Sequence, residues 1–172
     1  MGPVISRRAA LYLIGALVLV HNTEEAVAFA HLWPILHERV AEEAGIALSA
    51  TPEPVYLALL VATLAPAVIV AWAARQPDQP VRLWFALLIQ TVMFLNALAH
   101  VAAALIVFHG YAPGLLSAIL LNLPYSIFVN RKAQRERWLS RAASWLLLPG
   151  ALLVHGPLLF GLLLGGGVLA RG

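Results

Sequence analysis

The sequence predicts an all-α integral membrane protein, a bundle of five transmembrane helices that forms a single domain over residues 1–172. Composition is the first reason: 62% of the residues are hydrophobic and 11% are charged, whereas soluble domains are roughly 45–50% apolar and 25% charged. The second reason is that the apolar residues form five long runs, bounded by proline, glycine or charged residues. Cysteine is absent, which excludes disulfides and thiolate metal sites. We find no nucleic-acid-binding motif.

The five apolar runs cover about residues 9–33, 55–74, 83–108, 115–129 and 143–170. About 20 helical residues cross the hydrocarbon core of a bilayer, so only the fourth run is short for a span. We expect Pro34 to end the first run, followed by an acidic loop with a short helix over Ile35–Ala44. We expect Pro66 to kink the second run, which leads into a proline-broken turn at residues 75–82.

The last three runs differ in how they end. The third ends in the uncharged turn YAPG at residues 111–114, where proline followed by glycine is typical of a tight turn. We expect the fourth to be broken at Pro124, and a basic amphipathic stretch follows it over residues 130–141. The fifth contains Pro149 and Pro157, so its helix is also expected to be irregular.

Basic residues predict the orientation in the membrane. Nine of them fall on one side of a five-span arrangement, in this order: Arg7, Arg8, Arg75, Arg82, Arg131, Lys132, Arg135, Arg137 and Arg141. Cytoplasmic loops are enriched in lysine and arginine. We therefore expect a protein of the plasma (inner) membrane with its N-terminus in the cytoplasm and its C-terminus outside. The N-terminal segment has the general form of a signal peptide, but Glu24 and Glu25 would burden its cleavage region, so we expect it to remain as the first span.

The most informative stretch is HNTEE at residues 21–25, which interrupts the first apolar run. On a helix, His21, Glu24 and Glu25 lie three and four residues apart and share one side. A rise of ~1.5 Å per residue places His21 ~18 Å from the cytoplasmic end of its span. Ionised groups at such a depth are costly, so they usually face the protein interior and mark a function.

Polar residues lie at a similar depth in three other spans. Asn96 and His100, in the third span, are four residues apart and share a helix face. Asn122 and His155 belong to the fourth and fifth spans. The same estimate places all four between the middle of the membrane and its outer half. We therefore expect them to meet His21, Glu24 and Glu25 in one site.

The residue types in this site predict its chemistry. His21, Glu24, Glu25 and His100 carry imidazole and carboxylate groups, which are the usual ligands of Zn, Mn or Fe. A divalent metal is therefore the expected cofactor. The same groups are the usual general acids and bases, so these four residues are also the candidate catalytic residues of a site without a metal.

Four further residues are expected to support this site. Asn96, Asn122 and His155 would orient the imidazole and carboxylate groups. His155 precedes Gly156-Pro157 and has a second interpretation, in which it hydrogen-bonds backbone carbonyls freed at a kink. Tyr111 belongs first to the predicted turn, and contact with a substrate is the less favoured interpretation.

These motifs resemble a known family. HxxEE at residues 21–25, followed by NxxxH at 96–100 and YxPG at 111–114, is similar to the pattern of the small integral membrane proteins named for their HxxEE motif. The resemblance covers about residues 21–124 and implies a membrane protein that shares these polar positions. It implies no particular substrate or reaction. In architecture alone, the five-span plan with buried histidine and glutamate also looks like the sterol-isomerase and sigma-2-receptor group, which suggests a metal-free pair that donates a proton to an alkene.

The function we expect is that of a membrane enzyme acting on a lipid-like or other apolar substrate. The site would lie between helices and open toward the outer half of the membrane. The alternative is a non-enzymatic protein that binds or transports a small amphiphile, a proton or a cation. Transporters usually contain repeated halves, and we see no internal repeat. A structural subunit is the third class.

Overall fold

The computed structural model describes residues 5–44, 52–158 and 161, and these residues form helices joined by turns, with no strand among them. Three long helices come first: α1 (Arg7–Ala44), α2 (Glu53–Arg75) and α3 (Pro80–Ile106). Within the described ranges, these three are the helices long and apolar enough to cross a membrane. The all-helical class is thus confirmed and a membrane location is supported, whereas the number of five spans stays a prediction.

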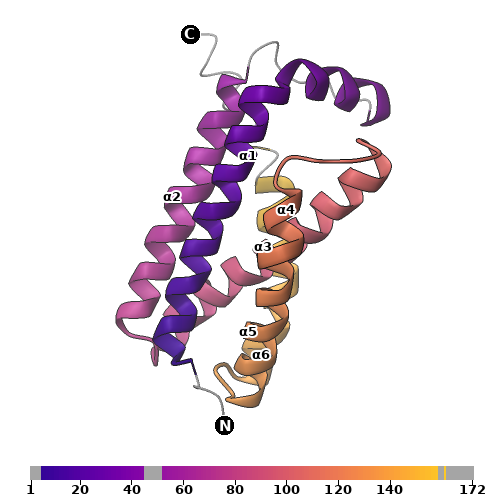
Figure 1. Cartoon of the computed structure of the whole chain (residues 1–172). Coiled ribbons are helices and arrows are strands. Elements are labelled where there is room, and N and C mark those ends of the chain that lie inside the picture. Colours follow the sequence, from indigo (N-terminus) through magenta and orange to yellow (C-terminus); the bar gives the residue numbers. More distant parts are fainter. Residues whose placement is uncertain (1–4, 45–51, 159–160, 162–172) are drawn as a thin grey trace.

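The sequence predicted that the first helix ends at Pro34, and this prediction was wrong. α1 continues through Pro34 to Ala44, and its last part turns away from the long axis of the bundle (Figure 1). Proline removes one backbone hydrogen bond and crowds the preceding turn, which bends a helix without necessarily ending it. The expected helix over residues 35–44 is therefore the continuation of α1. Glu38 and Glu43 on this part are exposed.

The fourth and fifth runs form several short pieces instead of single straight helices. The pieces are α4 (Leu115–Ser117), the π-helix η1 (Ala118–Asn122), α5 (Leu123–Arg135), α6 (Arg141–Trp145), α7 (Leu147–Leu153) and the π-helix η2 (Val154–Leu158). Pro124 directly follows η1, in which the Leu123 N–H bonds the Ala118 oxygen five residues back. Pro157 lies inside η2. The predicted interruptions thus occur as widened turns. The predicted end of the fifth span at residues 159–170 lies outside the described residues, apart from residue 161.

The bundle is apolar outside as well as inside. α1 and α2 run side by side, and α3 crosses behind the fourth segment, which comprises α4, η1 and α5 (Figure 1). Leu11, Ile14 and Leu87 belong to the buried core. Yet Val68 is 67% and Leu105 is 70% exposed. Large apolar side chains over much of a surface indicate contact with lipid, so this exterior fits a membrane environment.

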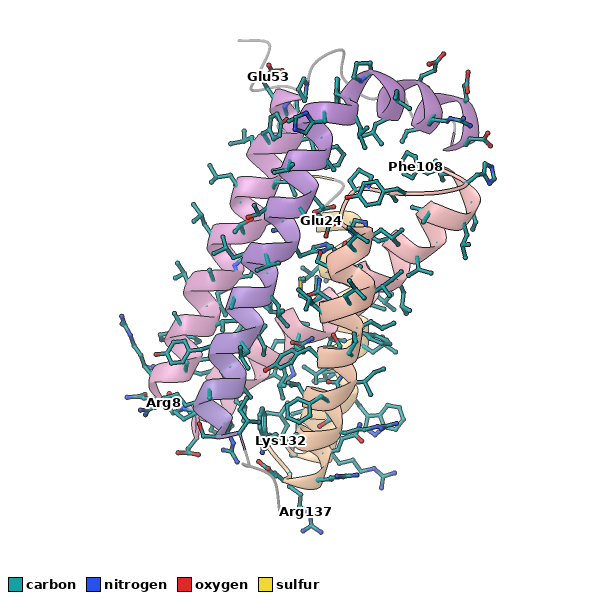
Figure 2. All side chains as sticks on the ribbon, viewed as in Figure 1. Arg8, Glu24, Glu53, Phe108, Lys132 and Arg137 are labelled. Carbon is teal, nitrogen blue, oxygen red and sulfur yellow. The ribbon has the colours of Figure 1, made fainter. Side chains whose placement is uncertain are left out.

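Basic loops gather at one end of the bundle. Arg7 at the start of α1 pairs with Asp78 in the turn before α3 at 2.8 Å. The guanidinium of Arg7 also lies 5.2 Å from the ring centroid of Trp138, in the turn after α5. Figure 2 shows Arg8 and Lys132 at this same end. The arrangement agrees with the predicted grouping of the charges, and the side of the membrane stays a prediction.

Candidate functional site

The buried face of α1 supplies the first half of the site. Leu11, Ile14 and Val18 line this face, and His21 continues it with no exposed surface. Glu25, four residues further on, shares the face, and its side chain is 13% exposed. The helical period that buries the apolar residues of α1 therefore buries the HxxEE motif as well.

Helix α3 supplies the second half. The Nε2 atoms of His21 and His100 are 3.1 Å apart, and the two rings meet edge to face with centroids 4.8 Å apart. Asn96, one turn before His100, places its Nδ2 atom 2.7 Å from His21 Nε2 and 3.1 Å from His100 Nε2. Three residues from two helices thus converge on one point.

Glu25 completes a group of three ligand-type side chains. Its Oε1 atom lies 3.2 Å from His100 Nε2, and its Oε2 atom lies 3.9 Å from His21 Nε2. His21, Glu25 and His100 each offer one ligand atom, and these atoms lie within 4.8 Å of one another. We call these three residues the metal-ligand group. They could hold a metal ion.

The other ring nitrogen of His21 contacts Ser117. The Ser117 hydroxyl lies 2.8 Å from His21 Nδ1 and 3.3 Å from the Gly114 oxygen. A neutral imidazole carries one N–H. With Ser117 donating to Gly114, the proton of His21 is on Nδ1 and Nε2 presents a lone pair toward Glu25 and His100, which is the form that binds a metal.

Gly114 lies directly against the metal-ligand group. A Cβ atom on this residue would lie 2.8 Å from His21 Cε1, 2.9 Å from Glu25 Cγ and 3.0 Å from His100 Cε1. The residue also has a φ of 78°, in the left-handed region that favours glycine. The glycine of the YxPG turn therefore lets the backbone pack onto the three side chains.

Glu24 forms its hydrogen bonds outside the metal-ligand group. Its Oε1 atom accepts hydrogen bonds from the Tyr111 hydroxyl at 2.9 Å and the Leu116 N–H at 3.0 Å. Its Oε2 atom accepts from the Ser117 N–H at 2.7 Å. Free N–H groups at a helix start favour a negative charge. Glu24 thus ties α1 to the start of the fourth segment, and the structure separates the two carboxylates that the sequence places together.

The hydroxyl of Tyr111 is held as a hydrogen-bond donor. Partial burial and the hydrogen bond to Glu24 raise the pKa of Tyr111 to about 12. The phenol therefore stays protonated throughout the physiological pH range. Tyr111 is 42% exposed, so it stands beside the Glu24 carboxylate at the edge of the site.

Of the other predicted residues, His155 contacts the site and Asn122 does not. His155 Nε2 lies 3.1 Å from Asn96 Oδ1, so His155 contacts the site through Asn96. Asn122 is 1% exposed, and neither its Oδ1 nor its Nδ2 atom has a hydrogen-bond partner among the described residues. The structure therefore connects His155 to the site and leaves Asn122 as a separate buried amide in η1.

Sequence reasoning missed Ser117 and the packing of Gly114. Ser117 contacts both His21 and Glu24, although the two partners are 96 and 93 residues away. Its position three residues after the glycine of the turn, at the start of a helix, was the available signal, because serine is common at helix starts.

The fold and the site define a class: a helical protein whose described part has three helices long and apolar enough to cross a membrane, with a histidine–glutamate cluster where α1, α3 and α4 meet. The chain belongs to the family described as proteins of unknown function with an HXXEE motif, whose model matches residues 12–129. This match covers more than half of the 172 residues and confirms the resemblance seen in the sequence. Comparison with curated proteins and with solved structures gave no match.

Proposed function

We propose that His21, Glu25 and His100 bind a divalent metal ion within the membrane. The observation that supports this most directly is that one ligand atom from each residue lies within 4.8 Å of the other two. Ligand atoms around a tetrahedral ion with bonds of ~2.0–2.1 Å lie ~3.3–3.4 Å apart. The two imidazole nitrogens, 3.1 Å apart, are already near this spacing, and the Glu25 carboxylate would have to shift to complete the site.

The hydrogen bonds around the group also support a cation. With the proton of its Nδ1 directed to Ser117, His21 would present a lone pair to the Glu25 carboxylate and to His100. A lone pair and a carboxylate repel each other unless a proton or a metal ion lies between them. The Asn96 amino group now donates to the same nitrogen, so metal binding requires this amide to turn.

Two histidines and one carboxylate form the ligand set of many catalytic Zn and non-haem Fe sites, and Mn also accepts it. Three protein ligands leave a coordination position free, which distinguishes catalytic from closed structural sites. An ion at such a site polarises an oxygen or activates a bound water. We propose that the protein is an enzyme and that the free position serves a lipid-like or other apolar substrate that enters from the bilayer.

The remaining residues of the site then have positioning roles. Asn96 and His155 hold the imidazoles from the side of α3 and η2. Glu24, predicted as a ligand or acid/base group, instead holds α4 against α1 through Ser117. Tyr111 donates to Glu24 at the exposed edge, where a substrate would pass.

A second candidate is a site without a metal. It is favoured by the Asn96 Nδ2 atom 2.7 Å from His21 Nε2, because this contact already satisfies the lone pair that a metal would need. In this case the Glu25–His100 pair, 3.2 Å apart, would exchange a proton with a substrate or bind a small amphiphile or cation without chemistry.

We also propose that the basic end of the bundle faces the cytoplasm in the plasma (inner) membrane. The contacts of Arg7 with Asp78 and Trp138 bring the basic loops together, and such loops are retained on the cytoplasmic side. The metal-ligand group then lies toward the outer half of the membrane.

Metal analysis of the purified protein tests the main proposal. The protein is purified with a histidine-free tag, and its Zn, Mn and Fe content is measured by mass spectrometry. We expect about one ion per chain in the wild type and in the control His31→Ala, since His31 is an exposed histidine of the same helix. His21→Ala and His100→Ala should each lose the ion. A folded wild type that takes up none of the three metals would reject the metal site and leave the proton-transfer candidate.

A further inference from the structure

A groove of about 1130 Å³ lies at the basic end of the bundle and shares no residue with the metal-ligand group. The start of α3, the end of α5, the turn after it and α6 form its walls. Figure 2 shows Arg137 at this end. The volume exceeds the roughly 300–1,000 Å³ of ordinary small-molecule sites, so the groove has room for a large ligand.

The charge of the groove has one sign. Arg137 and Arg141 line it, and no acidic residue of the described part of the chain does. Neither guanidinium forms an ion pair or a hydrogen bond with any part of the chain that the structure describes. The neighbouring Glu136 carboxylate is engaged by Lys132 and by the Trp138 N–H at 2.7 Å. The two arginines are therefore free to bind an anion.

The walls of the groove are apolar and aromatic. Trp84 donates from Nε1 to the Ala143 oxygen at 3.0 Å, which fixes α6 against α3. Trp138 is 5% exposed and forms a fixed part of the wall, whereas Trp145 is 71% exposed at the rim. Tryptophan is enriched at the level of lipid headgroups. The groove thus joins a cationic rim to an apolar wall at the expected depth of the membrane surface.

We propose that this groove binds an anionic phospholipid, with the phosphodiester between Arg137 and Arg141 and the acyl chains along Trp84 and Trp145. Guanidinium groups bind phosphate in a bidentate manner, and basic pockets between membrane helices bind anionic headgroups. Arg137 has a φ of 51°, which is uncommon for a residue other than glycine and often accompanies a functional constraint. This proposal does not depend on the metal site.

Tryptophan quenching by brominated lipids tests the proposal. The full-length protein is placed in nanodiscs of phosphatidylcholine with increasing brominated phosphatidylglycerol, and in a parallel series with brominated phosphatidylcholine. We compare the wild type with the double variant Arg137→Gln/Arg141→Gln. The matched control is Arg75→Gln/Arg131→Gln, which removes two exposed charges, at the end of α2 and within α5, that do not line the groove.

In the wild type and the control, we expect half-maximal quenching at a lower fraction of phosphatidylglycerol than of phosphatidylcholine. Each groove arginine should contribute about fivefold to this preference, so the double variant should lose about 25-fold. If the double variant does not fold, Arg141→Gln alone should lose about fivefold. Equal quenching by both lipids in the wild type, an equal loss in the control, or displacement of the lipid by inorganic phosphate alone would each overturn the proposal.

Discussion

Gly114 allows the backbone of the YxPG turn to pack closely against the metal-ligand group. Its Cα faces His21, Glu25 and His100, and its φ of 78° is one that L side chains avoid. Both features are satisfied by a residue without a side chain. The site therefore depends on a position that carries no chemical group of its own.

We expect Gly114→Ala to lower the free energy of unfolding by about 2–4 kcal/mol, through backbone strain and overpacking. The added methyl would also push the imidazoles apart and weaken metal binding. Thermal unfolding in detergent and metal content measure the two effects. Gly110→Ala is the matched control, because its Cβ would meet nothing nearer than the Phe108 oxygen at 3.8 Å. Equal effects of the two substitutions would contradict this account.

For single residues, the sequence predicted which side chains meet but not which role each of them has. The depth estimate correctly grouped His21, Asn96 and His100, because helical rise is constant. It could not assign different roles to Glu24 and Glu25, because both lie within one turn of His21. Their different partners are set by a segment far along the chain. It also could not foresee that Asn122 would have no partner among the described residues.

The fourth segment is the element that closes the site. It begins with the turn at Gly114, gives Ser117 to both His21 and Glu24, and then widens into η1. A π-turn inserts a residue into the helix and is frequent at functional sites. Here Pro124, which has no backbone N–H and whose ring crowds the preceding turn, directly follows the widened turn.

Substitution of the two adjacent carboxylates tests this division of roles. Glu24→Gln should destabilise the fold by about 1–2 kcal/mol, because it weakens the bonds to the start of α4, and it should retain the metal. Glu25→Gln removes a ligand and should weaken metal binding at least tenfold. Thermal midpoints and metal titrations of both variants provide the comparison. Loss of the metal in Glu24→Gln with retention in Glu25→Gln would reverse the assignment.

The sequence predicted the limits of helices that are set by the length of an apolar run. It missed the limits and irregularities that depend on prolines. α2 and α3 begin and end within about three residues of the predicted limits. α1 passes Pro34, because a proline bends a helix without necessarily ending it. The fourth and fifth runs contain prolines at widened turns. The hydrophobic pattern does not indicate whether a proline widens a helix or breaks it.

At the scale of the whole molecule, charge and hydrophobicity are arranged along one axis. Basic loops gather at one end, where Figure 2 shows Arg8 and Lys132. Along α1, the buried core residues from Leu11 to Val18 come next, and His21 of the metal-ligand group follows them. Because the chain has no cysteine, single cysteines can report which end is outside.

We expect an impermeant maleimide to label Glu43→Cys in intact cells and to label Gln79→Cys only after the membrane is opened. Both positions are exposed, Glu43 at the end of α1 and Gln79 in the turn between α2 and α3. Positive loops should hold the second position in the cytoplasm. The reverse labelling pattern would show that the orientation is opposite to the one proposed.

The long reach of the Glu24 contacts has a consequence for biosynthesis. The amides of Leu116 and Ser117 that hold this carboxylate lie 92 and 93 residues downstream, so the ribosome completes α1 long before they exist. During that interval the first helix carries an imidazole and two acids without the groups that later hydrogen-bond them. We therefore expect the stable integration of this helix into lipid to depend on the arrival of the later helices.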